Sequence, residues 1–199
     1  MVELVAKAKF PGFKMTIRTH QFWLLEKLTE DIEDFVMLSG IAEKEWDSYN
    51  LFDYKEPCIK ELAKVLHNEL CHFNHNGEKR NDLWINGWVN ILHKHDNINP
   101  HFHSAEKESY YSCNISLNNY NSKTLFYPPW GDRNGHIIVQ DNGKGQGMFF
   151  PQWLWHEVPP IDDPIRYTLG IDIHTDEMMK TADKTAPIRF SRKLNELYT

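Results

Sequence analysis

The sequence predicts a mainly β protein with flanking helices, built as an antiparallel sandwich or barrel. The main observation lies in residues 81–175, where short segments rich in aromatic and β-branched residues alternate with Asn, Gly, Pro and Asp turns. No helical periodicity separates these segments, so a parallel sheet with crossover helices is not expected. A second observation comes before them, where two segments carry apolar residues at three- and four-residue steps. These two helices should cover one face of the strands.

The elements are expected in the following order. Residues 1–19 form an extended lead-in, a helix begins at His20 and ends at Ser39-Gly40, and a second helix follows Pro57 and closes before Gly77. The strands are expected at 84–92, 110–117, 124–127, 136–140, 147–150, 156–158 and 166–173. A charged tail follows, with a short helix near 189–197. We expect one domain over 1–199, with lead-in and helices in 1–80, the β-barrel core in 81–175 and the tail in 176–199.

Composition and charge exclude several classes of protein. At 41% hydrophobic residues the chain has enough material for a core, which excludes wholesale disorder. The formal charge of −6 argues against sequence-independent nucleic-acid binding, and the three cysteines are too few for a disulfide scaffold. We find no long uncharged apolar run and no signal-peptide pattern, so no membrane partner and a cytoplasmic location are expected.

Histidine is the unusual residue, with 11 in the chain and four of them between His93 and His103. His101 and His103 stand two residues apart, and in an extended segment such residues point to the same side. Their imidazoles are therefore candidates for one metal ion. His156 is the candidate third ligand, because it stands alone among apolar and aromatic residues, where an unpaired imidazole is costly. The alternative is that an H-x-H pair arises by chance and that loop histidines are simply solvated.

The segment 166–173 alternates cleanly between two kinds of residue. One face carries Tyr167, Leu169, Ile171 and Ile173, and the other carries Arg166, Thr168 and Gly170. If the apolar face packs against the helices, Arg166 and Thr168 line the interior. A buried arginine requires an anion, and its planar fork suits a carboxylate. The alternative is that Arg166 begins an edge strand and points to solvent.

Taken together, these residues resemble the 2-oxoglutarate/Fe(II)-dependent oxygenases, near their prolyl-4-hydroxylase-like branch. The resemblance spans about 84–173. It is carried by the segments 88–91, 100–103, 111–118, 123–127 and 147–156, followed by 166–168. It implies a double-stranded β-helix, which is a jelly-roll or cupin-like barrel. It also implies a dioxygenase that uses Fe(II), 2-oxoglutarate and O2 to hydroxylate a small-molecule or peptidyl substrate.

The resemblance also implies roles for particular residues. His101, His103 and His156 would hold the metal, and Arg166 with Thr168 would hold the far carboxylate of 2-oxoglutarate. Tyr111, which we place on an inward-facing set with Cys113 and Ile115, would add a phenol hydrogen bond. Three tryptophans are expected near the mouth of the barrel, where we favour core or rim packing over substrate binding for each: Trp130, Trp153 and Trp155.

The sequence departs from the family at His103, where the common motif has Asp or Glu. Three neutral ligands would leave Fe(II) with a charge of +2 instead of +1. Either the site is a three-histidine variant, which we favour, or His101 and His156 bind with water or with another carboxylate. The nearby carboxylates are Asp96, Glu106 and Glu108.

A cupin-type metalloenzyme or metal-binding barrel that does not use 2-oxoglutarate is the alternative. His101, His103 and Glu108 fit the first cupin motif, and 151–156 has the spacing of the second, although Trp153 replaces its usual glycine. Glu108 would then be a ligand and Arg166 would have no role. A third hypothesis is a non-enzymatic barrel with structural histidines. The substrate and the oligomeric state are left open.

Overall fold

The computed structural model describes residues 2–10, 13–75, 77–104, 110–128, 137–181 and 190–199. Within these ranges the strands form a seven-stranded major sheet and a four-stranded minor sheet, with antiparallel pairing throughout. The major sheet has the order β1 (Val2–Phe10), β2 (Phe13–Trp23), β8 (Gln146–Pro151), β5 (Tyr111–Ser116), β10 (Ile165–Thr175), β3 (Leu83–His93) and β11 (Arg192–Lys193). The minor sheet has the order β4 (Ile98–His101), β9 (Trp155–Val158), β6 (Thr124–Tyr127) and β7 (Ile138–Gln140).

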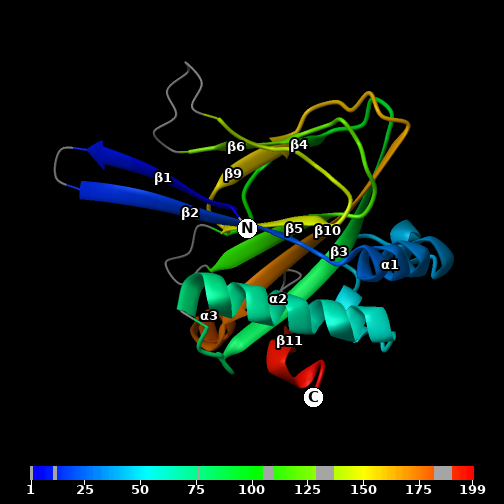
Figure 1. The fold of residues 1–199 in the computed structure, drawn as a ribbon, viewed down its shortest axis with the longest axis horizontal. Helices are drawn as coiled ribbons and strands as arrows, with labels where there is room; N and C mark the ends of the chain where they lie inside the picture. The colour runs from blue at the N-terminus through cyan, green and yellow to red at the C-terminus, as the bar shows by residue number, and fades with distance from the viewer. Residues whose placement is uncertain (1, 11–12, 76, 105–109, 129–136, 182–189) are drawn as a thin grey trace.

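Helices α1 (Glu26–Leu38) and α2 (Pro57–His75) cover the outer face of the major sheet, and the minor sheet lies on the other side (Figure 1). The helices bury their apolar stripes against Leu169, Ile171 and Ile173 of β10 in the largest hydrophobic cluster. Each such side chain contributes about 1.5–3 kcal/mol when fully buried. The expected cover of one face by two helices is confirmed.

Between the two sheets the hydrophobic clusters contain fewer residues than the cluster under the helices. A second cluster joins Phe126 of the minor sheet to Met148 and Phe150 of the major sheet, and a third gathers Leu92, Val158 and Ile161. The two clusters leave the middle of the sandwich to polar residues. This is where the site lies.

Two local expectations were wrong. The first helix begins at Glu26, not at His20, because residues His20 to Trp23 continue β2 and pair with β8. The apolar residues there alternate as strand residues do, and Phe22 stacks on Phe149 at a ring-centroid distance of 5.1 Å. In the tail, the described part of the region expected to be helical contains β11 and a 3-10 turn at Leu194–Glu196, while helix α3 comes earlier at Asp176–Thr181.

Candidate functional site

A cavity of about 630 Å³ opens between the two sheets, and residues from β3, β4, β5, β9 and β10 line it. Its wall carries the three candidate metal ligands at one place and Arg166 at another. Among the described residues, the charged side chains that line it besides the histidines are Arg166 and Asp172. The chemistry of the cavity therefore rests on a small set of groups.

The structure brings His101, His103 and His156 together, with one potential ligand atom from each lying within 4.8 Å of the others. His101 of β4 stands directly opposite His156 of β9 in the sheet register, and their ring centroids are 4.2 Å apart. His103 follows two residues after His101, and its ring centroid is 5.0 Å from that of His156. No other such group of metal-ligating side chains occurs in the part of the chain that the structure describes.

Each of the three imidazoles is oriented through its Nδ1 atom. Nδ1 of His101 lies 2.8 Å from the carbonyl oxygen of Asn99, and Nδ1 of His156 lies 2.9 Å from that of Leu154. A carbonyl only accepts hydrogen bonds, so both Nδ1 atoms donate and the lone pair is left on Nε2. This arrangement, in which one ring nitrogen is tied back and the other is free, is typical of metal-binding histidines.

The protonation state also suits metal binding. Burial, reinforced by the charges of His103 and His101, lowers the pKa of His156 to about 3. Burial likewise lowers the pKa of His101. Both imidazoles are therefore neutral near pH 7, which is the form that binds a metal ion.

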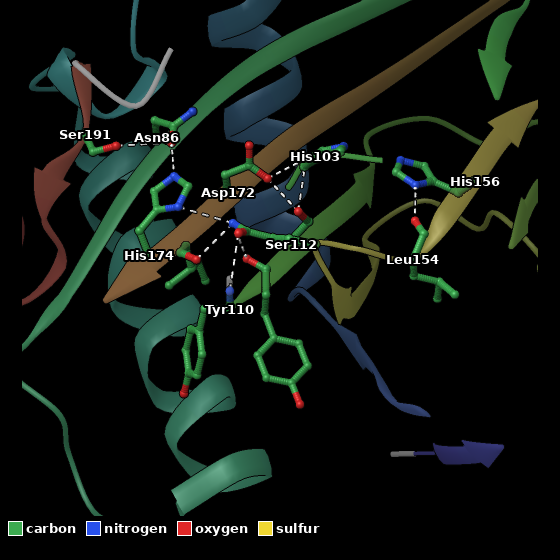
Figure 2. Close-up of polar contacts among 12 residues, drawn as sticks. Asn86, His103, Tyr110, Ser112, Leu154, His156, Asp172, His174 and Ser191 are labelled. Atoms are coloured by element: carbon green, nitrogen blue, oxygen red, sulfur yellow. Dashed lines mark hydrogen bonds and ion pairs between the residues drawn. The ribbon is translucent and has the colours of Figure 1, made fainter. Parts of the chain in front are cut away.

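Behind His103 lies a buried carboxylate that the sequence reasoning missed. Nδ1 of His103 is 2.5 Å from Oδ1 of Asp172, and the Ser112 hydroxyl donates to the same oxygen at 2.5 Å (Figure 2). Burial alone would raise the pKa of Asp172, but the charge and hydrogen bond of His103 outweigh it and hold the pKa below its usual value. The alternation along β10 was the available signal, because it places Asp172 on the same face as Arg166 and Thr168.

Gln152 anchors the loop that carries His103. Its carbonyl oxygen accepts hydrogen bonds from the backbone amides of His103 and Ser104, at 2.9 and 3.2 Å. Its side-chain amide donates to the carbonyl of Ile173 at 3.1 Å and reaches Nδ1 of His174 at 3.3 Å. Gln152 thus ties the end of β8 to β10 and to the loop that carries His103.

Of the other carboxylates considered from the sequence, only Asp96 is among the described residues, and it does not join this group. Asp96 lies in an exposed turn, where it accepts a hydrogen bond from the backbone amide of His93 at 2.8 Å. Glu106 and Glu108 fall outside the described residues.

Arg166 is the largest fully buried side chain among the described residues, with 1% of its surface exposed. It faces the cavity, as the alternation of its strand predicts. Its guanidinium donates to the hydroxyls of Thr124 at 2.9 Å and Ser122 at 3.4 Å, and it lies 4.7 Å from the centre of the Tyr120 ring. Burial lowers the pKa of Arg166.

Arg166 lacks an anion within the described part of the chain. No carboxylate there pairs with it, and its Nε has no hydrogen-bond partner. A buried guanidinium without a counter-charge is unfavourable unless a ligand supplies one. Thr168, which is also buried and lines the cavity, adds a hydroxyl two residues further along the same face. The residues present therefore fit a ligand carboxylate at this end of the cavity.

The orientation expected for Tyr111 was wrong. Residues 112 and 114 of β5 pair with Asp172 and Gly170 of β10, so they share the face that lines the cavity. Tyr111 belongs to the opposite face and packs edge-on against Phe73 of α2, with ring centroids 5.5 Å apart. A side chain on the helix-covered face cannot reach a ligand between the sheets.

Aromatic residues form one side of the cavity. Trp88 is almost fully buried beside His103, and the half-exposed Trp46 lies against it at a ring-centroid distance of 5.8 Å. Of the tryptophans expected near the mouth, Trp155 is exposed and contacts Phe102. Trp153 packs against the second hydrophobic cluster, and Trp130 lies outside the described residues.

Known proteins are similar to this chain in structure, not in sequence. No protein-family model matches the sequence, and no curated protein matches it. The fold matches a prolyl-4-hydroxylase from Pseudomonas putida with a TM-score of 0.61 and 11% identity, over 79% of this chain and 92% of that one. A prolyl hydroxylase from Trichoplax adhaerens, solved with a peptide fragment of hypoxia inducible factor, matches with a TM-score of 0.61 and 13% identity, over 83% and 87% of the chains.

A non-heme alpha-ketoglutarate-dependent carbocyclase from nogalamycin biosynthesis matches with a TM-score of 0.59 and 9% identity, over 79% of each chain. The expected double-stranded β-helix, the fold of these oxygenases, is therefore confirmed. At these identities the likeness shows the fold alone. In addition, none of the described helices is long and apolar enough to span a membrane.

Proposed function

We propose that this protein is a non-haem Fe(II)- and 2-oxoglutarate-dependent dioxygenase that hydroxylates a small-molecule or peptidyl substrate. One observation carries the proposal. The same cavity wall holds three imidazoles with one potential ligand atom each within 4.8 Å of the others, and a buried arginine that forms no ion pair among the described residues. A metal ion and a dicarboxylic keto acid would satisfy both groups at once.

In this proposal His101, His103 and His156 hold Fe(II), and three protein ligands leave coordination positions for the keto acid and O2. Arg166 binds the far carboxylate of 2-oxoglutarate through its free Nε–H and the neighbouring N–H groups. The hydroxyls of Thr168 and Thr124 line the same end of the cavity and add polar contacts. When bound, iron and 2-oxoglutarate supply the oxidising chemistry, with succinate and carbon dioxide as the products.

The protein's own contribution is positioning and exclusion of water. The guanidinium is fixed by Thr124, Ser122 and Tyr120 before any ligand arrives, so binding requires little reorganisation. Trp88 and Phe150 flank His103 and keep that side of the centre apolar. An apolar wall strengthens the interaction between Arg166 and a carboxylate.

The test is release of succinate and carbon dioxide from 2-oxoglutarate by the iron-loaded protein. We expect the wild type to release both only with Fe(II) and O2, and Arg166→Met to lose most of this activity. Arg192→Met is the matched control, because Arg192 is exposed and pairs with Asp53 far from the cavity. An Arg166→Met variant that turns over like the wild type would exclude the assigned role. A metal-loaded wild type that neither consumes nor binds 2-oxoglutarate would favour the cupin alternative.

A further inference from the structure

We propose that Asp172 is the carboxylate of the metal centre, acting through His103 instead of binding the metal directly. In this arrangement the three ligands are neutral imidazoles. The negative charge lies on Asp172, which contacts the ligand His103 and not the metal. Asp172 is then a positioning residue that orients His103 and sets the charge of the centre. The inference rests on the proposed metal site and assigns a residue that lies outside its ligand set.

The geometry fixes both partners firmly. Asp172 of β10 and Ser112 of β5 are direct neighbours in the register of the major sheet, and Asp172 lines the cavity while the Ser112 hydroxyl donates to its carboxylate. His103 comes from the loop after β4, and its Nδ1 meets Oδ1 of Asp172 at 2.5 Å. The side chains of His103 and Asp172 are only 10% and 14% exposed. The rigid major sheet therefore orients a ligand that is supplied by a loop (Figure 2).

The contact between Asp172 and His103 changes the net charge of the metal centre. Two histidines and one carboxylate around Fe(II) carry a net charge of +1, whereas three neutral histidines carry +2. A carboxylate that accepts the other N–H of a ligating imidazole makes that imidazole a stronger ligand and lowers the charge of the whole assembly. With Asp172 included, the centre returns to +1. Asp172 of β10 thus supplies the negative charge that the H-x-H motif lacks.

Direct ligation by Asp172 is the competing arrangement, and the contacts argue against it. Oδ1 of Asp172 accepts from both His103 and the Ser112 hydroxyl. Asp172 is also absent from the group of described side chains whose ligand atoms lie within 4.8 Å of one another. For Asp172 to bind the metal, His103 would have to leave the site.

The experiment measures binding of Co(II) to the metal-free protein by competition with a chelator, together with the visible absorption spectrum of bound Co(II). We expect Asp172→Asn to bind Co(II) about 10- to 100-fold more weakly than the wild type, because it keeps the hydrogen-bond acceptor and loses the charge. The control is Asp176→Asn, which removes the same charge four residues away, where the carboxylate contacts Trp84 and Lys193 outside the cavity. The control should bind as the wild type does.

Ser112→Ala provides a second variant if Asp172→Asn does not fold. It removes only the hydroxyl that holds Asp172, so it should weaken Co(II) binding more than Ser116→Ala, a control on the same face of β5. A purely structural role for Asp172 would lower the melting temperature of the metal-free protein and leave the Co(II) affinity of the folded protein unchanged.

Three results would overturn the inference. Equal Co(II) affinity in Asp172→Asn and Asp176→Asn would show that the charge is not used. Wild-type affinity in His103→Ala, combined with loss of binding in Asp172→Asn, would make Asp172 a direct ligand. A wild type that binds no Co(II), Mn(II) or Fe(II) would overturn the proposed function itself, which distinguishes that failure from the first two.

Discussion

At the scale of single residues, the buried charge of Arg166 favours binding of an anionic ligand but disfavours folding of the ligand-free protein. Its guanidinium is fully buried, yet no carboxylate among the described residues forms an ion pair with it, and Asp163 acts on it only through longer-range charge. Such a group is unfavourable for the folded state in the absence of a ligand, since a buried charge needs a partner. A residue that costs stability in this way is expected where it serves a ligand.

We therefore predict that Arg166→Met does not destabilise the ligand-free protein. Methionine has a similar length and needs no counter-charge, so the free energy of unfolding should stay equal or rise by about 1 kcal/mol. Denaturant unfolding of the variant and of the exposed control Arg192→Met checks this. A fall of about 2 kcal/mol or more would show that Arg166 is a structural residue.

His174 gives a second prediction, on pH. It is buried, its Nε2 donates to Asn86 at 2.9 Å, and burial lowers its pKa to about 4. Below about pH 6.5 the unfolded chain takes up a proton that the folded protein cannot accept, so stability falls as the pH drops toward 4. Over this window the loss from His174 alone is roughly 3 kcal/mol.

The check is the free energy of unfolding of the metal-free protein between pH 7 and 4. In His174→Gln, which keeps a donor and an acceptor, the decline should be shallower than in the wild type. His72→Gln, a change at an exposed histidine of α2, should leave the decline unchanged. Parallel curves for all three proteins would contradict the prediction.

At the scale of elements, β10 organises the site. Its outer face packs on the helices, and its inner face presents Arg166, Thr168, Gly170, Asp172 and His174 along the cavity. Its register with β3 places Trp88 opposite Gly170. A methyl group on Gly170 would lie 2.5 Å from the indole of Trp88, so the glycine makes room for the aromatic wall beside His103.

Gly170→Ala should therefore destabilise the protein by about 1–3 kcal/mol and reduce metal affinity, because it displaces the Trp88 ring that packs beside His103. Gly143→Ala is a suitable control, since its added methyl group would meet the exposed Trp23 ring, which is free to move. Thermal unfolding and Co(II) titration of both variants measure the difference. Equal behaviour of the two would show that the close approach of Gly170 to Trp88 has no consequence.

The strands β10 and β5 show which side-chain orientations could be predicted from the sequence. The faces of β10 were predictable because one is uniformly apolar and the other carries Arg166 and Thr168. In β5 the inner face is marked only by small polar residues such as Ser112 and Asn114, so the aromatic Tyr111 was assigned to the wrong side. Phe22 was assigned to a helix because strand alternation and helical spacing both bring apolar residues close together in a short run.

At the scale of the whole molecule, the fold follows from the many short strands, and the proposed metal centre depends on contacts between distant segments. His101 and His103 were detectable as a motif, and His156 as an isolated polar residue. The pairing of His103 with Asp172 joins residues 69 positions apart and leaves no local pattern. A residue on a distant strand that hydrogen-bonds to a candidate metal ligand can be identified only once the sheet register is known.

Because the proposed ligands come from β4, the loop after it and β9, a bound metal should hold this loop to the edge of the minor sheet. At a free metal concentration of 100 times the dissociation constant, binding raises the unfolding free energy by about 2.7 kcal/mol. Thermal unfolding with and without Mn(II) should show this in the wild type and in His93→Ala, and not in His101→Ala. Stabilisation that survives in His101→Ala would place the metal elsewhere.

The central claim is that one cavity holds a metal ion through three histidines and the keto acid through Arg166. Calorimetric titration of 2-oxoglutarate into the Mn(II)-loaded protein tests it most directly. The account predicts saturable binding with one site per chain in the wild type, loss of binding in Arg166→Met and loss in protein without metal. Absence of binding in the metal-loaded wild type, or equal binding by Arg166→Met, would contradict it.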